Sequence, residues 1–576
     1  MIKGFRIKGQ RSLSQGLAFI VLMVITVGMV IGCSSPPRAT SAASPSAPVR
    51  SAAPSPELSV GTNLTGIADW STQLPFLDAM KSSRRWITQC VDTDPGCTGQ
   101  WGTDEGDLLD LDDHGWPKSL PAPADQPIFT RVATLMFREI NGRYPGGQYV
   151  VLYEGEGTLG YGFDARKDEA ASRPGRDVIN VTPSHDGILL VISATDPNRT
   201  GDYLRNIHVV PIEAEETFAT EIFNPLLLER LQPFQSLRLM DWMRTNNSTV
   251  SEWSDRPQVD DYTYSIKGVP LEIMIELAER LGEDVWFCMP HMATDDYMRR
   301  FAELVKEQLD PSLKIYVELS NEVWNWMFDQ AHYALDQGKE RWQQEGDVFM
   351  QWYGMRTAQM ADIWSEVFAD QRDRLVLVLG TQTSWRGLER AALDCPLWVA
   401  EGHTPCYQHV DAYTITGYFT GGMVFRNNIA TVEGWLDEGQ EIAIEKAIAQ
   451  LSQGGMLEDG DHDGSIPGIR ELFDYHAAIA QERDLSLLVY EGGQHLALPD
   501  HERLTEFFIE LNRRPEMYDL YTQLLNEWRD AGGAVFMNFA DFGVPSRWGS
   551  WGVLENVADE ESPRYNALVD FIRDHS

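Results

Sequence analysis

Beyond Pro225 the chain alternates short apolar stretches with longer helical patterns, and this alternation restricts the fold more than any other feature of the sequence. Short apolar runs rich in β-branched residues are typical of buried parallel strands, which need helices to connect them. Counting a first run at 60–64, there are eight such strands, the others being 236–240, 285–289, 314–319, 374–379, 412–416, 486–489 and 534–539. Eight strands with helices in between predict an α/β fold, the (β/α)8 or TIM barrel.

A second pattern interrupts the predicted barrel after its first strand. Between 85 and 225, short alternating stretches are separated by Gly, Pro, Asp and Asn, with candidate strands at 148–153, 177–181, 187–192 and 206–211. Strands at this spacing predict an antiparallel β-sandwich. We therefore expect a barrel formed by 60–84 and 226–576, with 85–225 as an inserted β-rich domain.

The N-terminal region has the features of an export signal. Residues 1–32 combine a basic start with an apolar run, which is typical of a secretory signal peptide. Val30-Ile31-Gly32-Cys33 resembles a bacterial lipobox, in which Cys33 is lipidated and becomes the new N-terminus. Residues 33–59, rich in Pro, Ala and Ser, predict a flexible tether. The expected location is the bacterial cell envelope, and Ser34 after the cysteine favours the outer membrane; an uncleaved anchor helix or an ordinary signal peptide is the alternative.

The other five cysteines suit an oxidising compartment. Cys90 and Cys97 flank one irregular stretch and Cys395 and Cys406 another, so two local disulfides are expected. Cys288 lies in an apolar run and is expected to be a buried free thiol. No spacing of Cys and His predicts a zinc site.

Polar residues follow each predicted barrel strand, at the end where such a barrel places its catalytic groups. The fourth strand ends abruptly in Ser320-Asn321-Glu322, and the seventh is followed by Tyr490-Glu491. The remaining strands lead to Asp69-Trp70, Arg238 with Asp241, His291, Gln382, Tyr418, and Asn538 with Asp541. Strands four and seven lie on different sides of a barrel, so Glu322 and Glu491 could face each other across its mouth.

Two facing carboxyl groups supply the chemistry of glycosidic bond cleavage. One must keep a proton near neutral pH, which an apolar setting and a neighbouring carboxylate can arrange. The other must stay ionised, for which Tyr418 and Arg238 are candidate donors. In a retaining enzyme the two carboxyls lie roughly 5–5.5 Å apart, and Asn321 could hold the sugar 2-OH. The net charge of −39 argues against nucleic acid and anionic polymers as partners and favours a neutral substrate.

The stretches Leu319-Ser320-Asn321-Glu322-Val323-Trp324 and Val489-Tyr490-Glu491-Gly492-Gly493 resemble the acid/base and nucleophile motifs of clan A glycoside hydrolases. That clan comprises retaining (β/α)8 enzymes, among them cellulases, mannanases and xylanases. The resemblance implies Glu322 as acid/base, Glu491 as nucleophile, no cofactor, and a carbohydrate substrate. It also implies supporting roles for Arg238, His291 and Tyr418. Further candidates for sugar contacts are Asn321, Asp241 and the loop tryptophans Trp385, Trp548 and Trp551.

Each candidate also has a structural interpretation. Glu322 could be an acid at a helix N-terminus, and Glu491 part of a Glu-Gly-Gly turn. Arg238 could be a core ion-pair partner and His291 a core histidine. Glu318 shares the strand parity of Glu322 and is expected to be structural, inside the barrel.

An acidic loop at 458–464 resembles the start of a calcium loop. Asp459, Asp461 and Asp463 alternate, and Gly464 follows, but Arg470 stands where a twelfth-position Glu would be. A solvated acidic loop is the favoured alternative to a calcium site.

The leading hypothesis is a surface-anchored retaining glycosidase acting on a β-linked neutral polysaccharide or oligosaccharide. The alternative is a non-catalytic, glycan-binding envelope lipoprotein on a decayed barrel, with the β-rich insert as the sugar-binding module. A structural envelope lipoprotein would leave the polar residues at the strand ends without a role.

Overall fold

The computed structural model describes residues 58–121, 127–457 and 462–575. The predicted signal peptide, Cys33, most of the tether, and the acids Asp459 and Asp461 lie outside these residues. Within the described part of the chain, no helix is both long enough and apolar enough to span a membrane.

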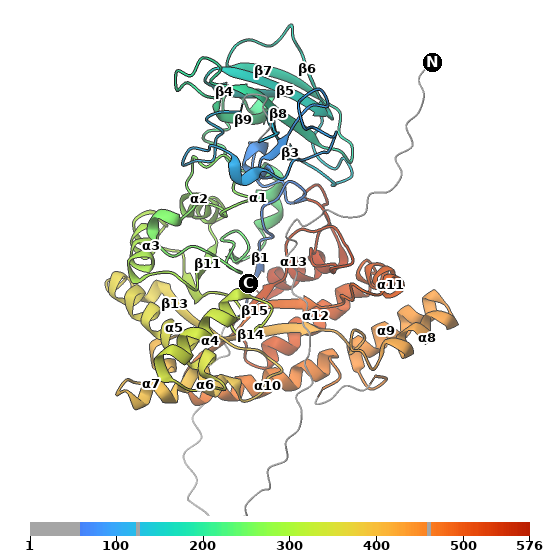
Figure 1. The fold of residues 1–576 in the computed structure, drawn as a ribbon. Coiled ribbons are helices and arrows are strands. Elements are labelled where there is room, and N and C mark those ends of the chain that lie inside the picture. The colour runs from blue at the N-terminus through green and yellow to red at the C-terminus, as the bar shows by residue number, and fades with distance from the viewer. Residues whose placement is uncertain (1–57, 122–126, 458–461, 576) are drawn as a thin grey trace, which may run out of the picture. The chain divides into compact units, whose positions relative to one another are not determined.

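Eight parallel strands close into a barrel in chain order, which confirms the predicted (β/α)8 fold (Figure 1). The barrel closes where β16 pairs in parallel with β1. The strands are β1 (Ser59–Asn63), β10 (Ser236–Arg238), β11 (Asp284–Met289), β12 (Ile315–Leu319), β13 (Leu375–Gly380), β14 (Ala412–Phe419), β15 (Ser486–Gln494) and β16 (Val535–Asn538). All eight lie where the apolar runs predicted them.

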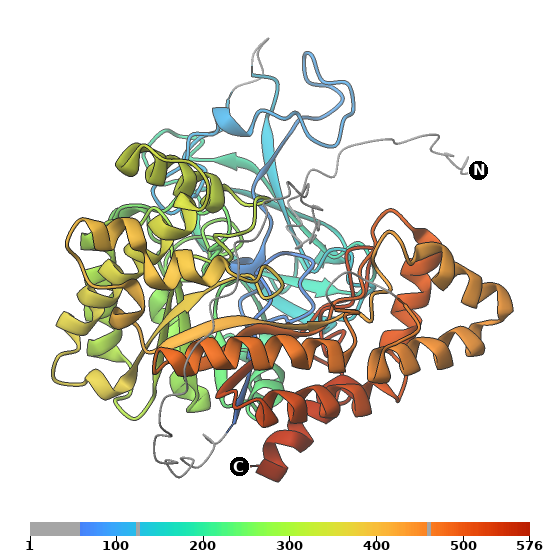
Figure 2. The same cartoon turned by 90° about the horizontal axis from the view of Figure 1, so that it is seen from below.

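Amphipathic helices cover the outside of the barrel (Figure 2). In α3 (Asp295–Gln308), Thr294 caps the first turn by accepting a hydrogen bond from the Tyr297 amide, and residues at helical spacing are buried against the barrel. The other helices are α1 (Pro225–Leu231), α2 (Leu271–Leu281), α4 (Asp329–Trp342), α5 (Val348–Val367), α6 (Leu388–Asp394), α7 (Pro396–Ala400), α8 (Ile429–Glu438), α9 (Gln440–Gln453), α10 (Ile466–Glu482), α11 (Glu502–Asn512), α12 (Met517–Asp530) and α13 (Pro563–His575).

Three long helical patterns in the sequence are each split into two helices. Between α4 and α5, Gln343 and Gly346 adopt left-handed backbone conformations with φ of 54° and 87°. Gly439, with φ of 132°, separates α8 from α9, and a short segment containing Pro515 separates α11 from α12. Such conformations end the helical hydrogen-bond ladder although the apolar periodicity continues on both sides.

The insert between β1 and α1 consists of two four-stranded antiparallel sheets, as the sequence predicted. One sheet has the order β2-β3-β8-β5 and the other β6-β7-β4-β9. Strands at the predicted positions are β4 (Gly147–Glu154), β7 (Arg176–Val181), β8 (Ile188–Thr195) and β9 (Arg205–Pro211); the others are β2 (Ile87–Gln89), β3 (Arg131–Met136), β5 (Gly157–Phe163) and β6 (Ala165–Lys167).

The insert packs against loops at the carboxyl end of the barrel. Trp86, just before β2, stacks on Tyr262 of the loop after β10, with 5.2 Å between ring centroids. Arg143 forms an ion pair of 2.5 Å with Asp559 of the loop after β16. The Arg143 carbonyl also accepts a hydrogen bond of 3.0 Å from Asn556. The insert is therefore fixed to two of the loops that surround the strand ends.

Both predicted disulfides are present, Cys90–Cys97 in the insert and Cys395–Cys406 after α6. Cys288 is a buried free cysteine on β11, also as predicted.

Candidate active site

Strand β12 ends in a strained turn that carries Asn321 and Glu322. Ser320 and Glu322 both have a positive φ, 62° and 43°, which is costly for residues other than glycine. Strain of this kind collects at functional sites, where the surroundings hold it in place. Here Asn325 donates to one Glu322 oxygen (2.9 Å) and the Tyr490 hydroxyl donates to the other (3.1 Å).

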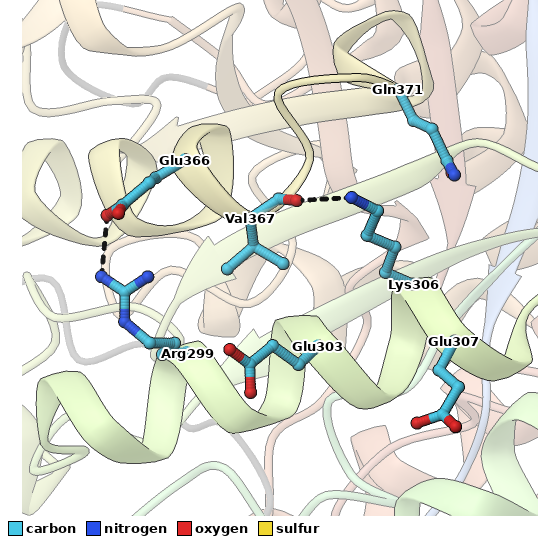
Figure 3. Close-up of a pocket in the computed structure, with 7 residues that line it drawn as sticks. All are labelled: Arg299, Glu303, Lys306, Glu307, Glu366, Val367 and Gln371. Atoms are coloured by element: carbon cyan, nitrogen blue, oxygen red, sulfur yellow. Dashed lines mark hydrogen bonds and ion pairs between the residues drawn. The ribbon is translucent and has the colours of Figure 1, made fainter.

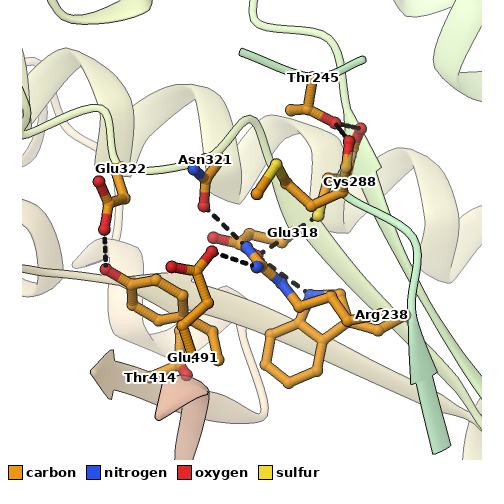
Figure 4. Close-up of polar contacts among 12 residues, drawn as sticks. Arg238, Thr245, Cys288, Glu318, Asn321, Glu322, Thr414 and Glu491 are labelled. Carbon is orange, nitrogen blue, oxygen red and sulfur yellow. Dashed lines mark hydrogen bonds and ion pairs between the residues drawn. The ribbon is translucent and has the colours of Figure 1, made fainter. Parts of the chain in front are cut away.

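Strand β15 carries Tyr490 and Glu491 on an irregular segment. In the pairing with β14, Ile415 lies opposite Val489 but Thr416 lies opposite Glu491, so Tyr490 is an extra residue in the ladder. A bulge of this kind changes the direction of a side chain that strict alternation would point away. As a result, neighbouring side chains both reach the site: Tyr490 contacts Glu322, and Glu491 contacts residues of other strands (Figure 4).

The fully buried Arg238 joins four strands (Figure 4). Its Nη1 donates to Glu491 Oε1 (2.9 Å) and to Asn63 Oδ1 on β1 (3.0 Å). Its Nη2 donates to Glu318 Oε2 (2.9 Å) and Asn321 Oδ1 (2.8 Å), both from β12 or its end. One guanidinium therefore orients two carboxylates, Glu491 and Glu318, and two amides, Asn63 and Asn321.

The two carboxyls of Glu322 and Glu491 sit in unequal electrostatic settings. Burial, followed by the nearby Glu491 charge, raises the pKa of Glu322 to about 8. Burial also raises the pKa of Glu491, but Arg238 and the Tyr418 hydroxyl, which donates at 3.0 Å, favour its ionised form. Because Glu322 has only neutral donors and Glu491 has a permanent cation, a proton shared by the two belongs on Glu322.

The orientation of Asn321 is fixed by two further amides. Its Nδ2 donates to Asn246 Oδ1 (3.1 Å), and Gln330 donates both to that oxygen (2.7 Å) and to the Asn321 carbonyl (2.8 Å). The amide oxygen of Asn321 points to Arg238, so its nitrogen is the end that can donate to another group.

Two other predicted residues lie outside this network. Burial, followed by the Glu491 charge, raises the pKa of Asp241 to about 7. His291 is buried against Tyr333, with ring centroids 5.1 Å apart, and burial lowers its pKa to about 4. Among the described residues, no hydrogen bond links His291 to Glu322 or Glu491.

Tryptophans occupy two parts of the mouth. Trp551 meets the Tyr418 ring edge-on at 6.1 Å and donates from its indole N–H to the Trp548 carbonyl (2.9 Å). Trp385, after β13, is 46% exposed. The Phe349 ring lies between two tryptophan rings, with centroid distances of 6.4 Å to Trp385 and 4.7 Å to Trp326. Of these three residues, Trp326 is four positions after Glu322 in the sequence.

Several contributors were not identified from the sequence as site residues: Asn63, Asn246, Asn325, Trp326, Gln330 and Tyr490. Tyr490 lies within one of the quoted motifs and Asn325 directly follows the other, which is the only signal that they give. Glu318 was expected to be structural, and it is buried inside the barrel as expected. It accepts hydrogen bonds from Arg238, from the Trp286 indole (3.1 Å) and from the Cys288 thiol (3.6 Å).

Of the three acids in the calcium-like loop, only Asp463 is described. Its carboxylate accepts hydrogen bonds from the amides of Ser465 (3.0 Å) and Gly455 (2.9 Å), and so supports the start of α10. Within the described ranges there is no group of three or more His, Cys, Asp or Glu that could hold a metal ion.

A hollow on the outer helical layer lies between α3 and α5 (Figure 3). In this hollow Arg299 forms an ion pair with Glu366 (2.8 Å), and Lys306 donates a hydrogen bond to the Val367 carbonyl (2.8 Å). None of the predicted site residues lines it, so it is separate from the barrel mouth.

No protein-family model matches the sequence, and comparison with curated protein sequences found no match. Among solved structures, the chain is similar to a glucosidase from Croceicoccus marinus, with 11% identity and a TM-score of 0.33 over 61% of this chain and 63% of that one. It is also similar to the exo-beta-1,4-mannosidase Op5Man5 from Opitutaceae bacterium strain TAV5 (12%, TM-score 0.32, 60% and 54%). A third match is a Thermobacillus composti GH10 xylanase (12%, TM-score 0.31, 60% and 90%).

The matched region thus spans less than two thirds of the glucosidase and mannosidase chains. With TM-scores below 0.5, these likenesses carry no weight for the activity, which has to be judged from the site.

Proposed function

We propose that the protein is a retaining glycoside hydrolase that cleaves β-linked neutral polysaccharides or oligosaccharides. The observation that supports this best is the unequal setting of two buried carboxyls at the barrel mouth. Glu491 is paired with Arg238 and Tyr418, as a nucleophile requires. Glu322 has a raised pKa, as a general acid requires.

In the first chemical step, the Glu491 carboxylate attacks the anomeric carbon of the sugar. The bond from that carbon to the leaving oxygen breaks, and Glu322 transfers its proton to this oxygen. The product is a glycosyl ester on Glu491, and Glu322 is left ionised. The loss of charge on Glu491 and the gain on Glu322 leave the net charge of the pair unchanged.

In the second step, Glu322 takes a proton from a water molecule whose oxygen attacks the anomeric carbon. The ester bond breaks and Glu491 leaves as a carboxylate, again bound by Arg238 and Tyr418. Each step inverts the anomeric carbon, so the product keeps the β configuration. Asn321, oriented by Arg238 and Asn246, would donate from its nitrogen to the sugar 2-OH.

A neutral substrate and an envelope location complete the proposal. The net charge of −39 disfavours polyanions. Two disulfides suit an oxidising compartment, and the Val30-Ile31-Gly32-Cys33 motif would attach the chain to a membrane by a lipid on Cys33.

The experiment that tests the activity is hydrolysis of a panel of β-glucan, mannan and xylan, with the anomeric products followed by NMR. We expect one polymer class to be cleaved with the β anomer formed first, and Glu491→Gln to abolish turnover. Initial formation of the α anomer would contradict the retaining mechanism. Full turnover by Glu491→Gln would contradict the nucleophile assignment, and sugar binding without any cleavage by the wild type would favour the non-catalytic alternative.

A further inference from the structure

An exposed aromatic surface runs from the barrel mouth onto the insert. It consists of the rings of Trp70, Phe163 and Trp101 with the guanidinium groups of Arg84 and Arg138, and we call it the aromatic ledge. We propose that the ledge binds a run of sugar units of the same glycan chain whose scissile bond lies at Glu322 and Glu491. This inference rests on the proposed function and gives the insert a role in it.

The ledge begins at the site. Thr65, just after β1, donates from its amide (2.9 Å) and hydroxyl (2.6 Å) to Asp541 at the end of β16. Gly66 lies so close to Asp241 that a Cβ atom there would be 3.6 Å from the Asp241 Cβ. The segment that leads to Trp70 is therefore held at the mouth, between residues that follow β10 and β16.

Ion pairing and stacking then continue from the barrel to the insert. The Arg84 guanidinium binds the Asp69 carboxylate (2.9 Å) and lies over the Trp70 ring, 5.6 Å from its centroid. The carbonyl of Asp69 accepts a hydrogen bond of 2.8 Å from the amide of Arg138. These contacts connect the segment after β1, through Asp69 and Arg84, to Arg138 of the insert.

On the insert, Arg138 connects this cluster to two stacked rings. Its guanidinium lies 5.4 Å from the centroid of Phe163, at the end of β5, and binds Asp186 at 2.7 Å. The rings of Phe163 and Trp101 are stacked, with centroids 5.6 Å apart and an interplanar angle of 18°.

The exposure of the ledge indicates a binding surface rather than packing. The side chains of Trp70 and Trp101 are 41% and 47% exposed. A bound ligand would remove this apolar surface from water. Their rings are held by stacking and by guanidinium groups that are themselves ion-paired, so little conformational entropy is lost when a ligand binds.

Sugars match this chemistry better than other ligands do. The C–H faces of pyranose rings pack on indole and phenyl rings, while their hydroxyls can donate to carboxylates and accept from guanidinium groups. Asp69 and Asp186 offset the charges of Arg84 and Arg138, so the ledge is not a net cationic surface for a polyanion. Because the ledge begins at the barrel mouth, the ligand that it would bind is the same glycan chain that enters the site.

The test compares long and short substrates in the variant Trp101→Ala. For the polymer that the wild type cleaves, we expect kcat/KM to fall roughly 5- to 10-fold per lost ring, mainly through KM. For an aryl glycoside of the same sugar, too short to reach the ledge, kcat/KM should stay within about twofold. Ile442→Ala, which removes an exposed apolar side chain on α9, is the control and should change neither value.

Binding is measured separately in the Glu491→Gln background by affinity electrophoresis in gels that contain the polymer. Adding Trp70→Ala or Trp101→Ala should weaken retardation. Equal losses on polymer and aryl glycoside would show a structural role and overturn the proposal, as would unchanged polymer kinetics and retardation. If neither substrate is cleaved by the wild type, the proposed function fails, whereas retardation that depends on Trp101 would still support the ledge.

Discussion

At the level of single residues, the most informative feature is the pair of tyrosines that serve the two glutamates. Tyr490 donates to Glu322 at 3.1 Å and Tyr418 donates to Glu491 at 3.0 Å. A hydrogen bond to a carboxylate favours the charged form and therefore lowers the pKa. The two hydroxyls thus act on opposite members of the pair, which allows their effects to be separated.

The alkaline side of the pH profile should report on Glu322. In the proposed mechanism Glu322 has to be protonated, so kcat/KM should fall as pH rises through about 8. In Tyr490→Phe the stabilising donor of the carboxylate is lost, and the pKa of Glu322 rises further. We expect the alkaline limb of kcat/KM to move to higher pH by about half a unit to one unit.

The acidic side should report on Glu491, which must be ionised. Tyr418→Phe removes a donor to its carboxylate, raises its pKa, and should move the acidic limb to higher pH with a loss of roughly tenfold in kcat/KM. Complete pH profiles of both tyrosine variants check these shifts. If the two variants moved the same limb, the assignment of acid and nucleophile would be wrong.

At the level of elements, the irregular part of β15 positions Glu491 and is expected to be sensitive to added volume. Gly492 follows Glu491, and a Cβ atom there would meet the buried Phe536 ring at 2.4 Å. Gly492→Ala should therefore displace β15 or Phe536, and should lower the free energy of unfolding by about 1–3 kcal/mol.

Because Glu491 adjoins this position, the same substitution should also reduce kcat/KM, by more than the loss of folded protein explains. Gly434→Ala in α8 is a matched control, since no atom lies within 4 Å of the added group and alanine favours a helix. Denaturant unfolding measures the free energy of unfolding of both variants, and kcat/KM is measured at a temperature where both are folded. An unchanged kcat/KM in Gly492→Ala would contradict the expectation that a displacement of β15 next to Glu491 impairs activity.

The elements also show how far the sequence could be interpreted. The barrel strands were predictable because each buried apolar run ends abruptly in polar residues. Strand β5 was not, because its glycines, among them Gly160 and Gly162, mask the alternation. The helix breaks at Gln343 and Gly439 depend on local backbone conformation that apolar periodicity does not encode.

At the site, the positions of Glu322 and Glu491 at strand ends were predictable from the sequence. Their hydrogen-bond partners were not, because those depend on how neighbouring strands are aligned. The contact of Tyr490 with Glu322 needs the bulge in β15, and strict alternation would point the Tyr490 side chain elsewhere. Asn63 and Glu318 meet Arg238 only because strands distant in the chain are aligned at one level of the barrel.

At the level of the whole molecule, the net charge and the proposed lipid on Cys33 would have opposite effects on membrane binding. A chain with a net charge of −39 is repelled by an anionic membrane surface, so a lipid on Cys33 would have to hold it there. We expect Cys33→Ser to move the protein from the membrane fraction to the soluble fraction, with loss of the lipid mass. Ser34→Asp keeps the cysteine and is the matched control. Membrane retention of Cys33→Ser would favour an uncleaved anchor helix.

The junction made by Arg238 has a consequence for how the protein is assembled during synthesis. Its partners come from both ends of the barrel sequence: Asn63 belongs to β1, and Glu491 belongs to β15, hundreds of residues later. The strand β1 likewise has no closing neighbour until β16 has been made. All strands of the β-rich insert, by contrast, lie between residues 87 and 211, so the insert can complete its sheets while the rest of the chain is still emerging. Arg238 therefore cannot gain its full set of partners until the strand that carries Glu491 has been made.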